Sequence, residues 1–162
     1  KKTLIEIGSG LGNVVDLLST KTPFQCSGSD ISSVAISRAT KKYQNNKFYC
    51  FDIKSKELNV EDFGKYDIVI LNQVLWYVLE DIDAVFHNAS KLLNDKGVFV
   101  ISNAFTNEQR YDREVVDGFG GLVQYIQNNQ KGKFKLKHAS LNEYNSIMYA
   151  DGIVVLETLN PT

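Results

Sequence analysis

The sequence predicts an α/β fold: a seven-stranded, mostly parallel sheet with an antiparallel last strand and helices on both faces. Apolar runs typical of strands alternate with amphipathic runs typical of helices along most of the 162 residues. The run YDIVILN at residues 66–72 is apolar enough for burial on both faces, as in a central parallel strand. The last two strand runs have no clear helix pattern between them, so they are expected to pair antiparallel.

Short runs rich in apolar residues give the expected strands, which lie at residues 3–7, 24–29, 47–51, 66–72, 97–102, 133–138 and 147–156. Helices are expected at residues 12–20, 32–43, 82–93 and 108–128. The second helix begins at a serine that is an N-cap candidate, and the turn sequence NDKG ends the third. Three glycines at positions 118, 120 and 121 are expected to interrupt the fourth helix.

Composition and charge exclude several classes of protein. The net charge is -1 and the chain is 43% hydrophobic, whereas a general nucleic-acid or anionic-membrane binder would be more basic. Four alternating lysines in KGKFKLKH are interpreted as protection of a sheet edge. The two cysteines are isolated, which argues against a zinc site or a disulfide scaffold, and no acidic metal cluster is apparent. We expect no metal, no membrane span and a reducing cytoplasmic location.

The domain prediction is a single unit over residues 1–162, because two prolines and no low-complexity tract give no sign of a boundary. The chain begins with Lys1 rather than Met and enters its first strand almost at once. A segment that precedes this strand in the whole protein is therefore left open, as is the oligomeric state.

The stretch LIEIGSGLGNVVDLLS places three glycines between the first strand and the first helix. Ligands of open α/β sheets bind beyond the carboxyl ends of the strands, and glycines there let a ligand lie directly on backbone N–H groups. A dinucleotide fingerprint would need a glycine where the chain has Asn13. The pattern present is instead acid-x-Gly-x-Gly-x-Gly, formed by Glu6, Gly8, Gly10 and Gly12.

This pattern resembles motif I of class I S-adenosylmethionine (SAM)-dependent methyltransferases, which have a Rossmann-like fold. The resemblance continues in order through GSD, CFDI, YDIVILNQVLWYV and LLNDKGVFVIS to the closing hairpin. It implies that SAM is bound and is released as S-adenosylhomocysteine. The residues that it assigns to the cofactor are Glu6, Gly8, Ser9, Gly10, Gly12, Asp30, Ile31, Asp52, Ile53, Asn72 and Gln73.

The chemistry of SAM suits these side chains. In the family, the acid at Asp30 accepts both ribose hydroxyls, and the residue at Asp52 meets the adenine amino group with Ile53 against the ring. The ammonium and the sulfonium suit acids, carbonyls and aromatic faces. Other interpretations stay open: Asp30 as a helix N-cap, Asp52 as a turn residue, and Glu6 as a solvated glutamate at a sheet edge.

The acceptor side of the site is less defined. Many small-molecule members of the family have a histidine where this chain has Tyr77, so Tyr77 is a candidate for orienting the substrate. The segment after residues 97–102 resembles the variable substrate lid, and its Arg110 and Arg113 are candidates for clamping an anion. For both arginines, a solvated helix face is the open alternative.

The resemblance implies methyl transfer to an oxygen or nitrogen of a small molecule, with an anionic or sugar-type metabolite as the narrower expectation. It is nearest to bacterial nodulation N-methyltransferases and polysaccharide-linked enzymes. The DNA-methylating type is disfavoured because LNQV stands where that type has an (Asp/Asn)-Pro-Pro-aromatic motif. Two alternatives are a non-catalytic SAM-fold subunit and, against the glycine spacing, an NAD-dependent oxidoreductase.

Overall fold

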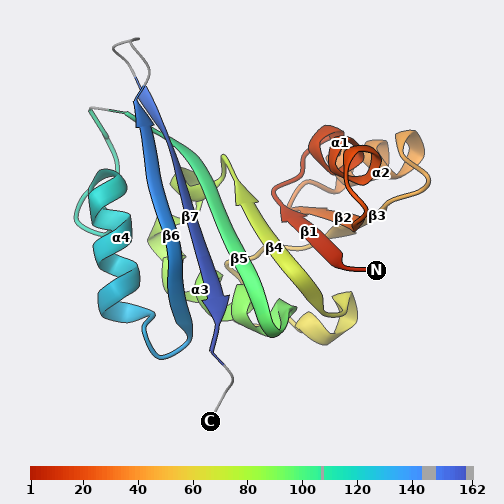
Figure 1. Ribbon diagram of the computed structural model, residues 1–162. Coiled ribbons are helices and arrows are strands. Elements are labelled where there is room, and N and C mark those ends of the chain that lie inside the picture. Colours follow the sequence, from red (N-terminus) through yellow and green to blue (C-terminus); the bar gives the residue numbers. More distant parts are fainter. Residues whose placement is uncertain (107, 144–148, 160–162) are drawn as a thin grey trace.

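The strands form one sheet in the order β3-β2-β1-β4-β5-β7-β6 (Figure 1). A computed structural model describes residues 1–106, 108–143 and 149–159. The strands are β1 (Thr3–Ile7), β2 (Gln25–Asp30), β3 (Lys47–Cys50), β4 (Tyr66–Asn72), β5 (Leu93–Thr106), β6 (Phe134–Glu143) and β7 (Tyr149–Thr158). The α-helices are α1 (Asn13–Lys21), α2 (Ser33–Lys42), α3 (Ile82–Leu92) and α4 (Gly118–Asn129), and short 3-10 turns are η1 (Val60–Phe63), η2 (Leu75–Tyr77) and η3 (Leu79–Asp81).

The pairing of the strands confirms the predicted fold class. β1 runs parallel to both β2 and β4, and β7 runs antiparallel to both β5 and β6. After β3 the chain returns across β1 to form β4, so the strand order reverses between β1 and β4. In open α/β sheets such a reversal leaves a crevice at the carboxyl ends of the two strands.

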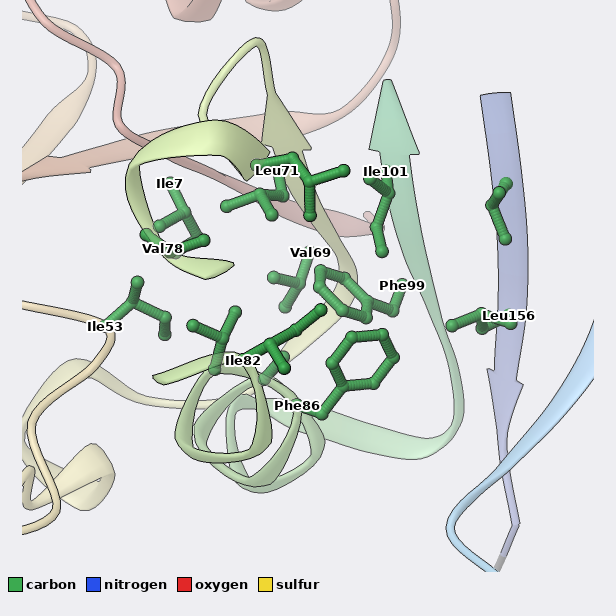
Figure 2. Close-up of a cluster of buried hydrophobic side chains, with 14 of the residues drawn as sticks. Ile7, Ile53, Val69, Leu71, Val78, Ile82, Phe86, Phe99, Ile101 and Leu156 are labelled. Atoms are coloured by element: carbon green, nitrogen blue, oxygen red, sulfur yellow. The ribbon is translucent and has the colours of Figure 1, made fainter. Parts of the chain in front are cut away.

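Alternation along β1 divides the core between the two faces of the sheet. Ile5 and Ile7 point into the larger core under α3, whereas Leu4 packs with Val15 of α1 on the other face. Figure 2 shows the larger core, where Phe86 of α3 meets Phe99 of β5 edge to face with ring centroids 5.4 Å apart. Burial of these apolar side chains holds the helices against the strands.

Coverage of the sheet is uneven. α1 and α2 lie over the end of the sheet formed by β1, β2 and β3, and α3 and α4 lie on the opposite face (Figure 1). Among the described residues, no helix covers β5 and β7 on the α1 face. Val100, Ile153 and Val155 consequently remain half-buried there.

The capping prediction for the second helix is confirmed, because the Ser32 side chain accepts a hydrogen bond from Ala35 N at 3.2 Å. The predicted helix at residues 108–128 is wrong in its first half. α4 begins only at Gly118, which has a left-handed φ of 66° and follows a loop. The glycines that were expected to interrupt the helix therefore lie at its start. The last strand was expected at residues 147–156, of which 147–148 lie outside the described residues.

Candidate active site

A cavity of about 500 Å³ opens at the carboxyl ends of β1 and β4, where the strand order reverses. Its walls come from the ends of four strands and the loops that follow them. The lining residues are Ile7, Gly8, Asp30, Ile31, Phe51, Asp52, Ile53, Lys54, Asn72, Gln73, Val74, Tyr77 and Val78. We call this space the cofactor cavity; most of the residues assigned to the cofactor from the sequence lie in its wall.

The glycine loop is held down onto β2. The N–H groups of Gly8 and Ser9 both donate to Ser29 O, at 2.7 and 2.8 Å. Gly8 has a φ of 76°, and a Cβ there would lie 2.3 Å from Val74 Cγ2. Glycine is required at this position because the loop and the segment after β4 approach too closely for any side chain.

The space beside the Gly10 backbone is open, whereas the space beside Gly8 is filled. Gly10 also has a left-handed φ, of 53°, but a Cβ at Gly10 would meet no atom within 4 Å. Packing within the protein therefore gives no reason for glycine here. The open space beside its backbone leaves room for the close approach of a ligand.

Asp30 ties the loop to the second helix. Its Oδ2 accepts from Gly10 N and its Oδ1 accepts from Ser32 N, both at 2.9 Å. The interpretation of Asp30 as a helix N-cap is wrong, because Ser32 caps α2; Asp30 instead accepts from the backbone of that cap. Each carboxylate oxygen keeps a further lone pair, and the side chain lines the cavity, so it can still accept ligand hydroxyls.

Glu6 is a buried acid beside the cavity rather than in its wall. It is 2% exposed, so the interpretation as a solvated edge glutamate is wrong. Asn72 Nδ2 donates to its Oε1 at 3.2 Å, but its Oε2 has no partner among the described residues. Burial raises the pKa of the Glu6 carboxyl, and the Asn72 hydrogen bond offsets part of that rise. An unpartnered oxygen of this kind is costly to bury, and Asn72, which binds the other oxygen of Glu6, lines the cavity.

Two of the other assigned residues lie near the cavity without lining it. The Ser9 hydroxyl is buried and has no hydrogen-bond partner in the described structure. Gly12 caps α1 with a φ of 78°, and a Cβ there would lie 2.6 Å from the Phe48 ring. The structure gives Gly12 a packing role against Phe48.

The far end of the cavity combines an acid with apolar walls. Asp52 Oδ1 accepts from Lys54 N at 2.9 Å, and Ile53 is buried beside it. The Asn88 side chain of α3 donates to Ile53 O at 2.7 Å and so fixes this turn. Phe51, Lys54, Val74 and Val78 also line the cavity but were missed from the sequence, although Phe51 and Lys54 directly flank the predicted Asp52 and Ile53.

Gln73 holds the ends of β4 and β5 together. Its φ is 57°, which is rare for a residue other than glycine, and its Oε1 accepts from Ala104 N at 3.0 Å. Strain of this kind collects at functional sites. The strained turn directs the chain into η2, which carries Trp76 and Tyr77.

A second cavity of about 620 Å³ adjoins the first and shares Tyr77 with it. It is lined by Trp76, Tyr77, Leu79, Thr106, Glu108, Gln109, Arg110, Tyr111 and Asp112. We call it the acceptor cavity. Tyr77 is 77% exposed, because it stands between the two spaces rather than in the core.

The side chain of Gln109 organises the outer wall of the acceptor cavity. Its Nε2 donates to Tyr111 O and Val116 O, both at 2.7 Å, and its Oε1 accepts from Gly118 N at 2.8 Å. These bonds make residues 109–118 a closed loop where the sequence predicted a helix. Asp112 has a φ of 53° within this loop.

The two candidate arginines have different environments. Arg110 lines the acceptor cavity. Arg113 lies outside that lining and pairs with Asp117, with Nε–Oδ1 at 3.0 Å and Nη2–Oδ2 at 3.2 Å. This pair leaves Arg113 poorly placed to clamp an anion in the cavity.

A seven-stranded sheet with β7 inserted antiparallel, a glycine loop and a strand-end acid defines the Rossmann-like fold of class I methyltransferases. A family model described as a methyltransferase domain matches residues 5–99. The chain belongs to this family, and it is a SAM-dependent methyltransferase. No curated protein sequence matches it significantly.

Solved structures with the same fold have low sequence identity to this chain. The MccD protein is 13% identical, with a TM-score of 0.77 over 98% of this chain and 90% of its own. N-methyltransferase NodS from Bradyrhizobium japonicum WM9, in complex with S-adenosylhomocysteine, is 15% identical, with a TM-score of 0.70 over 97% and 78%. The [4+2]-cyclase SpnF is 12% identical, with a TM-score of 0.71 over 96% and 75%. At these identities the likeness shows the fold alone.

Among the described residues, no set of three or more histidines, cysteines, aspartates and glutamates is placed to hold a metal ion. The described helices include none that is long and apolar enough to cross a membrane.

Proposed function

We propose that the enzyme binds SAM in the cofactor cavity and transfers its methyl group to an oxygen or nitrogen of a small molecule held in the acceptor cavity. One observation carries this proposal: the glycine loop, two strand-end acids and an apolar wall converge on one cavity, and a second cavity adjoins it at Tyr77. Both volumes fall within the range of roughly 300–1,000 Å³ that is usual for small-molecule sites.

The residues present fit SAM. Asp30 would accept the ribose hydroxyls, and Asp52 would meet the adenine amino group with Ile53 against the ring. The unpartnered Oε2 of Glu6 and the open space beside Gly10 are suited to the ammonium and carboxylate of the methionine moiety. Ser9, Gly8, Gly12, Ile31, Asn72 and Gln73 would complete this binding site by shaping or supporting it.

When bound, SAM supplies a methyl group that is already activated on a sulfonium. The protein then has to align the acceptor atom with the methyl–sulfur bond and to keep water out of that line. Tyr77 would contribute to this alignment, because it lines both cavities. An anionic or sugar-type acceptor is the narrower expectation from the sequence; Arg110 would favour an anion, whereas Glu108 and Asp112 in the same wall would disfavour one.

Calorimetric titration with S-adenosylhomocysteine and with NAD tests the cofactor assignment. We expect S-adenosylhomocysteine to bind and NAD not to bind, because Asn13 stands where a dinucleotide site needs its third glycine. Binding of NAD alone, or of neither compound, would show that the cofactor cavity has been assigned wrongly.

A further inference from the structure

Three aromatic rings line the acceptor cavity, and they differ in how firmly they are held. Trp76 is fixed: its Nε1–H donates to Ala104 O at 2.9 Å, and its ring packs edge-on against Phe105 at 5.2 Å between centroids. Tyr77 and Tyr111 are each 77% exposed. The face of an aromatic ring carries negative charge density, so such a wall attracts cations and repels anions.

The charged groups of the cavity also favour a cationic ligand. Glu108 and Asp112 supply two carboxylates, against the single guanidinium of Arg110. In the described part of the chain, none of these three side chains forms an ion pair, whereas the neighbouring Arg113 is paired with Asp117. The cavity therefore carries a net negative charge, and its charged groups remain available to a ligand.

We propose that the methyl acceptor is an amine, which the acceptor cavity binds as an ammonium between its aromatic faces and the carboxylates of Glu108 and Asp112. This inference rests on the proposed function, because it assigns the acceptor of that same site. The wall that carries these groups is preformed, since the Gln109 side chain closes the loop and Asp112 O accepts from Val115 N and Val116 N.

The chemistry requires the bound ammonium to lose a proton before transfer. That proton passes to a carboxylate of the cavity or to water at its open rim. The freed nitrogen lone pair then forms the N–C bond to the methyl group as the C–S bond breaks. The bonding electrons stay on sulfur, which leaves as the neutral thioether S-adenosylhomocysteine.

Trp76 is the only tryptophan of the chain, so its fluorescence reports directly on the acceptor cavity. Three probes of similar size differ mainly in charge: cyclohexylmethylamine, cyclohexanecarboxylate and cyclohexylmethanol. Each is titrated with and without S-adenosylhomocysteine. We expect the amine to bind about tenfold more tightly than the alcohol, and the carboxylate to bind most weakly. Tightest binding of the carboxylate, equal binding of all three, or no binding would overturn the inference.

A double variant, Glu108→Gln with Asp112→Asn, tests whether the carboxylates cause the preference. Asparagine tolerates the left-handed backbone at position 112, so the loop is expected to persist. The variant should lose the tenfold advantage of the amine. The matched control is Glu114→Gln, which removes an exposed acid of the same loop outside the cavity and should keep the preference. An unchanged preference in the double variant would contradict the assignment.

Titration of the same samples with S-adenosylhomocysteine separates this inference from the proposed function. If S-adenosylhomocysteine binds and the amine does not, only the acceptor assignment fails. If S-adenosylhomocysteine fails to bind, the proposed function fails, and the titrations without it still measure the charge preference of the cavity.

Discussion

The two cavities that share Tyr77 have walls of different structure. The cofactor cavity is built from strand ends and a glycine loop, and backbone hydrogen bonds from that loop to Ser29 O hold it in place. The outer wall of the acceptor cavity is a loop closed mainly by one side chain, Gln109. Changes in the first cavity should thus alter stability and cofactor binding together, whereas changes in the second should alter acceptor binding alone.

The largest effect is expected from Gly8→Ala. A Cβ would lie 2.3 Å from Val74 Cγ2, and the φ of 76° would be strained for alanine. Left-handed strain and overpacking together should lower the free energy of unfolding by about 2–5 kcal/mol. Chemical denaturation measures this loss, and calorimetry should show that S-adenosylhomocysteine binding falls with it.

Gly10→Ala is the matched control, because a Cβ there meets nothing within 4 Å. Only backbone strain remains, so the loss of stability should be about 1–2 kcal/mol. Binding of S-adenosylhomocysteine should still weaken, since the methyl group enters the space assigned to the ligand. Equal losses of stability in the two variants would contradict the close packing of Gly8 against Val74.

The next largest effect is expected from Asp30→Ala. The carboxylate would accept ribose hydroxyls in charge-assisted hydrogen bonds, so its loss should weaken S-adenosylhomocysteine binding about 10- to 150-fold. Asp62→Ala removes an exposed acid that lines neither cavity and should leave the affinity unchanged. An unchanged affinity in Asp30→Ala would exclude the ribose assignment.

The cofactor half of the molecule was largely predictable because its signals are local. A strand, a glycine loop and a helix occur in one stretch, and the parallel pairing of β1 with β2 and β4 brings the distant Asp30 and Asn72 to the same edge. The sequence also predicted the antiparallel β7. It did not show that Glu6 is buried beside Asn72, since that depends on how the two strands align.

The acceptor half was less predictable because side-chain hydrogen bonds decide there between a loop and a helix. Residues 108–117 contain good helix formers, yet three hydrogen bonds of Gln109 and the left-handed Asp112 hold a loop there. Nothing in the local pattern reveals that a side chain will replace the backbone bonds of a helix. The different environments of Arg110 and Arg113 follow from that loop and were hidden for the same reason.

Glu6→Gln should change how stability depends on pH. Burial raises the pKa of Glu6 in the folded protein above its ordinary value of 4.5. As the pH rises past 4.5, the unfolded chain releases this proton first, so the folded state loses stability until the pH exceeds the folded pKa. The variant should lack this decline, as measured by thermal unfolding across that range without ligand. A decline of equal size in both proteins would assign it to another group.

Tyr77→Ala tests how much one aromatic face contributes to binding in the acceptor cavity. The side chain is mostly exposed, so stability should change little. Loss of one aromatic face should weaken binding of cyclohexylmethylamine about two- to tenfold, as measured by Trp76 fluorescence. Tyr77→Phe keeps the ring and should retain most of the affinity. If Phe and Ala lose equally, the hydroxyl rather than the aromatic face carries the contact.

The smallest effect is expected from Arg113→Ala. Its probe binding is compared with that of Arg110→Ala. The Arg113–Asp117 pair is exposed on both sides, and exposed pairs contribute little to stability. The variant should therefore match the parent in thermal unfolding and in the binding of all three cyclohexyl probes. Arg110→Ala should instead strengthen binding of the amine and weaken binding of the carboxylate, because it removes the only cation in the cavity wall formed by residues 108–112. If Arg113→Ala altered probe binding as much as Arg110→Ala, the loop would have to present both guanidinium groups to the ligand.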